Sequence, residues 1–144
     1  MQLTTASEII RFAVELEDKA AKFYEGLATR HPEAKEVFSS FVKENKKNKI
    51  LVQRVYNEVV TDAIETGFSF EGFEVDEYMI DVDLAQDADL SRAVKKALET
   101  EEEIQKFYAT AAEMSKALLA DIPRAFDRIA KKRTGRKEKL KSLF

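Results

Sequence analysis

The chain has 144 residues, 44% of them hydrophobic and 35% charged, with a formal net charge of −3 and only four Gly and two Pro. This length suits one domain with a sizeable core, and the low content of Gly and Pro favours a helical protein. The lack of Cys excludes disulfides, zinc–thiolate sites and iron–sulfur clusters, and the single His31 excludes a metal site built from several histidines.

The sequence also bears on location. No apolar run approaches the roughly 20 residues that a membrane-spanning helix needs. The first residues, "MQLTTASEII", lack the basic region and apolar core of a signal peptide. We therefore expect a cytoplasmic protein, with a single domain over residues 1–144 and no membrane partner.

Apolar residues recur at helical spacing in the first half of the chain. The first predicted helix covers about 7–28 and follows a capping box formed by Thr5 and Glu8. The second covers about 33–60, with Pro32 at a first helical position. These two segments are joined by a short turn, which predicts a helical hairpin.

The second half repeats this arrangement after a long acidic connection over 62–89, which has ten acidic residues and no basic one. A third helix is predicted over about 90–118, and a fourth follows Asp121, which we expect to cap it. Short, long and short connections between four amphipathic helices predict an all-α four-helix bundle with one long crossover between helices 2 and 3.

The first and third predicted helices are related in sequence. Residues 13–24, "AVELEDKAAKFY", align without gaps on residues 97–108, "ALETEEEIQKFY", and are identical at one Ala, two Glu, Lys, Phe and Tyr. The second and fourth predicted helices share a weaker similarity. Phe-x-x-Phe-Val at 38–42 in the second helix corresponds to Phe-x-x-Ile-Ala at 126–130 in the fourth. We therefore expect a duplicated hairpin whose halves are related by a pseudo-two-fold axis.

Each predicted helix has polar residues in the middle of its apolar stripe. These residues are Glu17 in the first helix, Asn45 and Asn48 in the second, Glu101 in the third, and Arg133 and Arg136 in the fourth. Facing one another across a bundle, they would form one polar layer in the core. In the alternative interpretation the glutamates face solvent and the arginines belong to a solvated basic tail, with Gly135 ending the last helix.

This pattern resembles the rubrerythrin-type domain of the ferritin-like superfamily over nearly the whole chain. In that fold two helices each supply one Glu and the other two each supply Glu-x-x-His, all directed at a pair of metal ions. Glu17 and Glu101, each followed seven residues later by the Tyr of "KFY", match the single-Glu ligands. Tyr24 and Tyr108 correspond to tyrosines that form hydrogen bonds around the metal site in the family, although core packing alone would also explain them.

The Glu-x-x-His positions of this family fall on different residues here. Asn45-x-x-Asn48 and Arg133-x-x-Arg136 occupy them. Asn is a weak neutral ligand for iron, and Arg stays protonated. The resemblance therefore implies a degenerate di-iron site in which two carboxylates oppose two guanidinium groups, with no bound metal and no catalysis.

The function implied by this comparison is that of a scaffold or partner-binding protein. The alternative is a rubrerythrin-like, peroxide-reducing oxidoreductase that keeps iron or manganese on a partial carboxylate site made of Glu17, Glu101 and Glu44. Nucleic-acid binding through the basic tail, 131–141, is not expected because the tail lacks aromatic residues that could stack on bases. We expect a homo-oligomer such as a dimer, to which the acidic connection and the basic tail could contribute.

Overall fold

The computed structural model describes residues 3, 5–59, 70, 72–116 and 121–143, which form an all-helical protein. The long helices are α1 (Ala6–Arg30), α2 (Lys35–Val59), α4 (Leu90–Met114) and α5 (Asp121–Lys141), and two short 3-10 helices are η1 (Pro32–Ala34) and η2 (Val75–Tyr78). No β-strand occurs in these described ranges. None of the helices within them has the length and apolar character required to cross a membrane.

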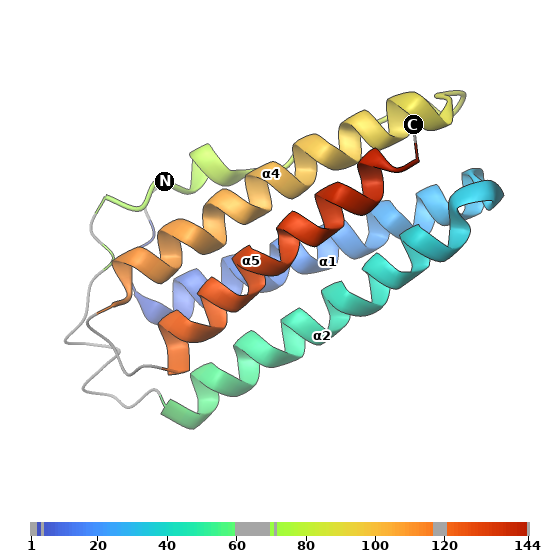
Figure 1. The fold of residues 1–144 in the computed structure, drawn as a ribbon. Coiled ribbons are helices and arrows are strands. Elements are labelled where there is room, and N and C mark those ends of the chain that lie inside the picture. Colours follow the sequence, from blue (N-terminus) through green and yellow to red (C-terminus); the bar gives the residue numbers. More distant parts are fainter. Residues whose placement is uncertain (1–2, 4, 60–69, 71, 117–120, 144) are drawn as a thin grey trace.

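The four long helices lie side by side around one apolar core (Figure 1). Helix α1 packs against α2 and α4, and α5 packs against the same two helices. Helices α2 and α4 are therefore diagonal neighbours across the core. They run in the same direction in Figure 1, opposite to α1 and α5.

The segment that precedes α4 lies along the surface of α1 and α4. The backbone N–H of Leu3 donates to the carbonyl of Phe73 at 2.9 Å, and the Lys19 ammonium on α1 donates to the carbonyl of Ile80 at 2.9 Å. Most of the earlier part of the predicted acidic connection, residues 62–69 and 71, lies outside the described residues.

Local signals in the sequence explain where the helices begin. The predicted capping box is confirmed, because the Thr5 side chain accepts from the Glu8 backbone while the Glu8 carboxylate accepts from the Thr5 backbone. Asp89 caps α4 by accepting from the backbone N–H of Arg92 at 2.9 Å. Gly135 lies within α5, so the helix-ending role considered for it is wrong.

Three helix boundaries differ from the sequence prediction. Pro32–Ala34 form a 3-10 turn, so α2 begins at Lys35 instead of near residue 33. Helix α4 ends at Met114, and after its C-cap Ser115 the N–H of Lys116 donates to the carbonyl of Glu113 in a tighter turn. Helix α5 begins at Asp121 itself. The predicted capping role of Asp121 would have placed the first helical residue one position later, at Ile122.

The predicted apolar stripes face the core. All of the following stripe residues are buried: Ile10, Ala13, Ala20, Leu27, Phe38, Phe41, Val42, Val52, Val94, Ala97, Ile104, Ala111, Ile122, Phe126, Ile129 and Leu140. Burial of these side chains provides most of the favourable free energy of folding. The same periodicity carries the polar residues of the stripes into the core.

Candidate functional site

The six polar residues predicted for the core are all buried in the middle of the bundle. Their relative exposures are 1% for Glu17, 1% for Asn45, 5% for Asn48, 0% for Glu101, 0% for Arg133 and 2% for Arg136. The alternative interpretation, in which the two glutamates and the two arginines face solvent, is therefore wrong. Below we call these six residues the polar layer.

Arg133 joins the two acids of the polar layer. Its Nη2 donates to Glu17 Oε1 at 2.6 Å, and its Nε lies 2.9 Å from Glu101 Oε2. The first contact is a charge-assisted hydrogen bond, whereas the second is a close ion pair whose angle lies outside hydrogen-bond geometry. One guanidinium from α5 thus bridges carboxylates from α1 and α4.

Arg136 connects the polar layer to the edge of the bundle. Its Nη1 donates to Glu101 Oε1 at 3.0 Å, and its Nε donates to Glu44 Oε2 at 2.8 Å. Its Nη2 donates to the backbone carbonyl of Phe41 at 3.3 Å. Since the Glu44 side chain is 41% exposed, Arg136 links a fully buried acid to a partly solvated one.

Two tyrosines bind the acids in a reciprocal way. The Tyr24 hydroxyl on α1 donates to Glu101 Oε1 on α4 at 2.6 Å, and the Tyr108 hydroxyl on α4 donates to Glu17 Oε1 on α1 at 3.1 Å. Burial and the adjacent carboxylate hold the pKa of each hydroxyl well above its ordinary value of 10.0. Both tyrosines are therefore hydrogen-bond donors, and the exchange between helices agrees with the predicted pseudo-two-fold axis.

The two acids have pKa shifts of opposite direction. For Glu101, burial acts to raise the pKa, but Arg133 and Arg136 together outweigh burial and lower it below 4.5. For Glu17, burial raises the pKa above 4.5 and outweighs the same two arginines. The short contact between Arg133 and Glu17 does not reverse this direction, because Glu17 contacts one guanidinium whereas Glu101 contacts two.

Asn45 is less well satisfied than the charged residues of the polar layer, each of which keeps at least one hydrogen bond. Neither Oδ1 nor Nδ2 of Asn45 has a hydrogen-bond partner among the described residues. An unpaired buried amide costs roughly 1–3 kcal/mol. An apolar residue at position 45 would therefore stabilise the core better than Asn45 does.

The donor set does not fit a pair of iron or manganese ions. Oε1 of Glu17 and Oε1 of Glu101 each accept from one guanidinium and one tyrosine hydroxyl, and Oε2 of Glu101 lies 2.9 Å from Arg133 Nε. Two permanent cations at this point repel a divalent ion, and no imidazole is present in the layer. No group of three or more His, Asp or Glu residues in the described ranges is arranged to hold a metal.

Glu44 does not complete a mononuclear site with Glu17 and Glu101. Its carboxylate pairs with Arg136 at the edge of the bundle, so a guanidinium lies between Glu44 and Glu101. The sequence pattern did not predict the ion pair of Glu44 with Arg136. The signal that could have identified it is the length of an Arg side chain, which reaches beyond its own helix face.

Comparison with known proteins identifies no relative: no family model matches the chain, and no curated protein or solved structure is significantly similar to it.

Proposed function

We propose that this protein is a ferritin-like bundle of rubrerythrin type whose metal-ligand positions have been replaced by internal ion pairs, and that it acts as a non-catalytic scaffold. The observation that carries this proposal is the contact of Arg133 with both Glu17 and Glu101, the two acids that match the single-Glu ligands of the family. Each acid comes from the middle of one of two sequence-related helices, as the family pattern requires.

The helix directions support the same assignment. Since α2 and α4 run in the same direction, the chain between them has to return along the bundle (Figure 1). Residues 72–89 lie against α1 and α4, which is a suitable position for one long crossover. A single long crossover distinguishes ferritin-like bundles from simple up-and-down bundles.

Charge balance explains how the core tolerates the replacement. In the family site four carboxylates oppose two divalent cations, so the charges cancel. Here Glu17 and Glu101 oppose Arg133 and Arg136, which again gives a neutral core. Planar guanidinium–carboxylate pairs are well suited to this role because Arg keeps its proton and donates in a fixed geometry.

The competing proposal, a peroxide-reducing oxidoreductase, is disfavoured by the same contacts. A metal ion on Glu17 and Glu101 would have to displace the fully buried guanidinium of Arg133 from both acids. We therefore assign no redox step to these residues. A scaffold role requires only the fold and its surfaces.

Rebuilding the metal site tests the proposal. A quadruple variant, Asn45→Glu, Asn48→His, Arg133→Glu and Arg136→His, restores two Glu-x-x-His motifs opposite Glu17 and Glu101. We expect it to bind two Co²⁺ ions, with a visible absorption band, and to gain thermal stability from metal because binding is linked to folding. The wild type should be purified without stoichiometric iron or manganese and should bind none tightly.

A fifth substitution provides the control. Adding Glu17→Gln to the quadruple variant removes one ligand and should weaken Co²⁺ binding at least tenfold, as loss of a ligand or its support does in metal sites. A quadruple variant that folds but takes up no metal would mean that these positions do not converge on one centre. Stoichiometric iron in the wild type would favour the oxidoreductase.

A further inference from the structure

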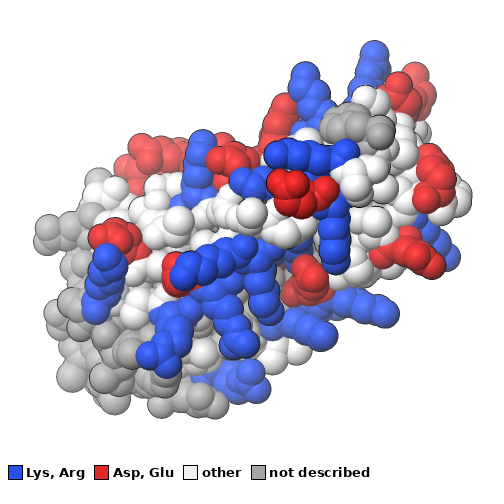
Figure 2. Space-filling view, in the orientation of Figure 1, with Lys and Arg blue, Asp and Glu red and all other residues white. Residues whose placement is uncertain are grey.

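An open groove of about 440 Å³ lies between α2 and α5. Leu51, Val55 and Ala125 provide its apolar surface, and Arg124, Arg128 and Lys131 provide its positive charge. We call these six residues the basic groove. Figure 2 shows Lys and Arg side chains gathered over α5 and the neighbouring part of α2.

Two arginines of the basic groove are available to a partner. Lys131 is paired with Asp127, whose carboxylate lies 2.9 Å from its ammonium. Arg124 and Arg128 are exposed and form no ion pair with any residue in the part of the chain that the structure describes. Because an exposed cation beside apolar surface favours an acidic ligand with an apolar side chain, the groove selects for that combination.

The segment that precedes α4 has this combination. Residues 74–89 include seven acidic residues and no basic one. Within them Met79 is 58% exposed, one of the two most exposed large apolar side chains in the described part of the chain, and it lines two surface hollows.

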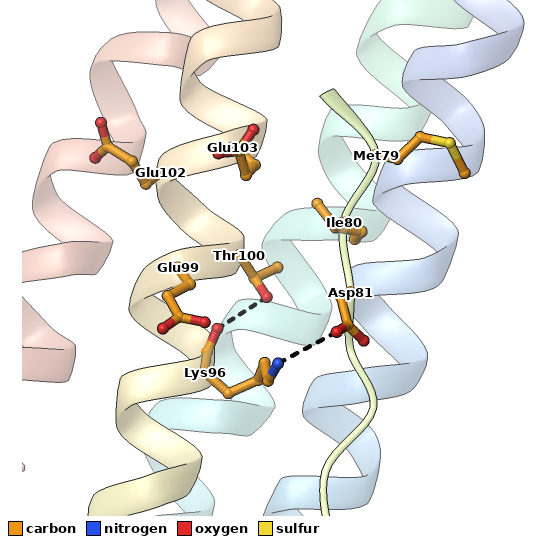
Figure 3. A pocket seen from close by; sticks show the side chains of 8 residues that line it. All are labelled: Met79, Ile80, Asp81, Lys96, Glu99, Thr100, Glu102 and Glu103. Atoms are coloured by element: carbon orange, nitrogen blue, oxygen red, sulfur yellow. Dashed lines mark hydrogen bonds and ion pairs between the residues drawn. The ribbon is translucent and has the colours of Figure 1, made fainter. Parts of the chain in front are cut away.

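Helix α4 adds further acid beside Met79. Glu99 and Glu103 line the same hollow of about 400 Å³ as Met79 and Asp81. Figure 3 shows Asp81 paired with Lys96, at 3.6 Å, and Glu99 and Glu103 further along α4. We call Met79, Asp81, Glu99 and Glu103 the acidic face.

The basic groove and the acidic face lie on opposite sides of the bundle. The groove is formed by α2 and α5, whereas the segment of the acidic face lies against α1 and α4. One molecule therefore cannot join its own two surfaces. Groove-to-groove contact is also disfavoured, because it would bring Arg124 and Arg128 of two molecules together.

We propose that the basic groove binds the acidic face of a second copy of this chain, with Met79 packed on Leu51, Val55 and Ala125. The contact is head-to-tail, so further copies can add in a row unless the rotation closes a ring. This inference is independent of the proposed loss of a metal site, since none of its residues belongs to the polar layer.

A polyanion is a poorer occupant of the groove. No aromatic residue lines it, so bases have no stacking surface.

Complementary variants test the proposal. The groove variant is Arg124→Gln with Arg128→Gln, and the face variant is Met79→Ser with Glu99→Gln and Glu103→Gln. All of these side chains lie at the surface, so both variants should fold. The control is Lys35→Gln with Lys139→Gln, which removes the same charge as the groove variant at two exposed positions away from the groove.

Sedimentation velocity is the measurement. The wild type should form species larger than dimers in about 10 mM salt and dissociate in about 1 M salt, where the screening length falls from roughly 30 Å to 3 Å. The groove variant and the face variant should each be monomeric alone. An equimolar mixture should form a one-to-one heterodimer and nothing larger, because only one intact groove and one intact face remain.

The control variant should associate like the wild type. A mixture that stays monomeric, or a groove variant that associates like the wild type, would overturn the proposal. So would a monomeric wild type that binds duplex DNA or anionic phospholipid vesicles through Arg124 and Arg128, because the groove would then serve a different ligand.

Discussion

The two helical hairpins contribute matching acids and tyrosines to the core. Glu17 in α1 corresponds to Glu101 in α4, and Tyr24 corresponds to Tyr108 in the same alignment. Each tyrosine donates to the acid of the other hairpin. This exchange ties the two hairpins together through hydrogen bonds that neither hairpin could form alone.

The second helix of each hairpin breaks the symmetry. Helix α2 supplies the amides of Asn45 and Asn48, whereas α5 supplies the guanidinium groups of Arg133 and Arg136. All the positive charge of the polar layer therefore comes from one helix. Asn45 is left without a hydrogen-bond partner among the described residues, so its amide adds little to the stability of the layer.

This difference makes the two acids unequal. Glu101 has both guanidinium groups within 3.0 Å, and Glu17 has Arg133 at 2.6 Å as its only ion pair within the described residues. A sequence repeat thus places two equivalent acids in environments that stabilise their charges differently. Substitutions at equivalent positions should therefore have unequal effects.

Loss of Arg133 should have the largest effect. Arg133→Met leaves Glu17 buried without a cation, which should lower the free energy of unfolding by roughly 3–5 kcal/mol. Arg136→Met should cost less, because Glu101 keeps Arg133 and Glu44 is partly solvated. Urea denaturation monitored by circular dichroism measures both losses.

A double variant checks that Arg133 and Glu17 act as a pair. Arg133→Met combined with Glu17→Gln removes both charges and should be more stable than Arg133→Met alone. Losses that simply add in this cycle would show that the two side chains do not interact in solution.

The next largest difference in stability is expected between the losses of the two tyrosine hydroxyls. Tyr108→Phe removes one of two donors to Glu17 and should cost about 2 kcal/mol, whereas Tyr24→Phe leaves Glu101 with both arginines and should cost about 1 kcal/mol. Thermal and urea denaturation give the comparison. A larger loss for Tyr24→Phe would mean that its shorter hydrogen bond, 2.6 Å, matters more than the remaining partners.

Much of this core could be predicted from periodicity. Glu17 and Glu101 fall where an apolar residue is expected, and helical geometry then requires that they be buried together with their neighbours. The sequence repeat independently predicted that the first and third helices are equivalent. The capping signals at Thr5 and Asp89 follow local rules that depend on few neighbouring residues.

The pairing within the layer could not be predicted in the same way. Whether Arg136 reaches Glu101, Glu44 or solvent depends on side-chain rotamers and on the axial shift between α2 and α5, and neither leaves a periodic signal. The position of residues 74–89 was equally inaccessible, because an irregular segment has no period. Its contacts, such as that of Lys19 with the carbonyl of Ile80, use backbone groups that every residue has.

The pH dependence of stability should show the smallest and most specific difference between the hairpins. Glu17 has a raised pKa, so its contribution to stability is fully present below 4.5 and is lost as the pH rises through its folded-state pKa. Glu101 has a lowered pKa, so its contribution is present above 4.5 and is lost as the pH falls through its folded-state pKa. The two acids thus act in opposite directions.

The opposite pH dependences of the Glu17 and Glu101 contributions can be measured with the variants Glu17→Gln and Glu101→Gln, because Gln does not titrate. Relative to the wild type, Glu17→Gln should gain stability as the pH rises from below 4.5 through the raised pKa of Glu17. Glu101→Gln should lose stability relative to the wild type as the pH rises toward 4.5 and then remain at a constant disadvantage. Urea denaturation at a series of pH values provides both curves. Parallel curves for the two variants would show that one guanidinium stabilises a buried carboxylate as well as two do, and that the asymmetry between the asparagine and arginine helices has no energetic consequence.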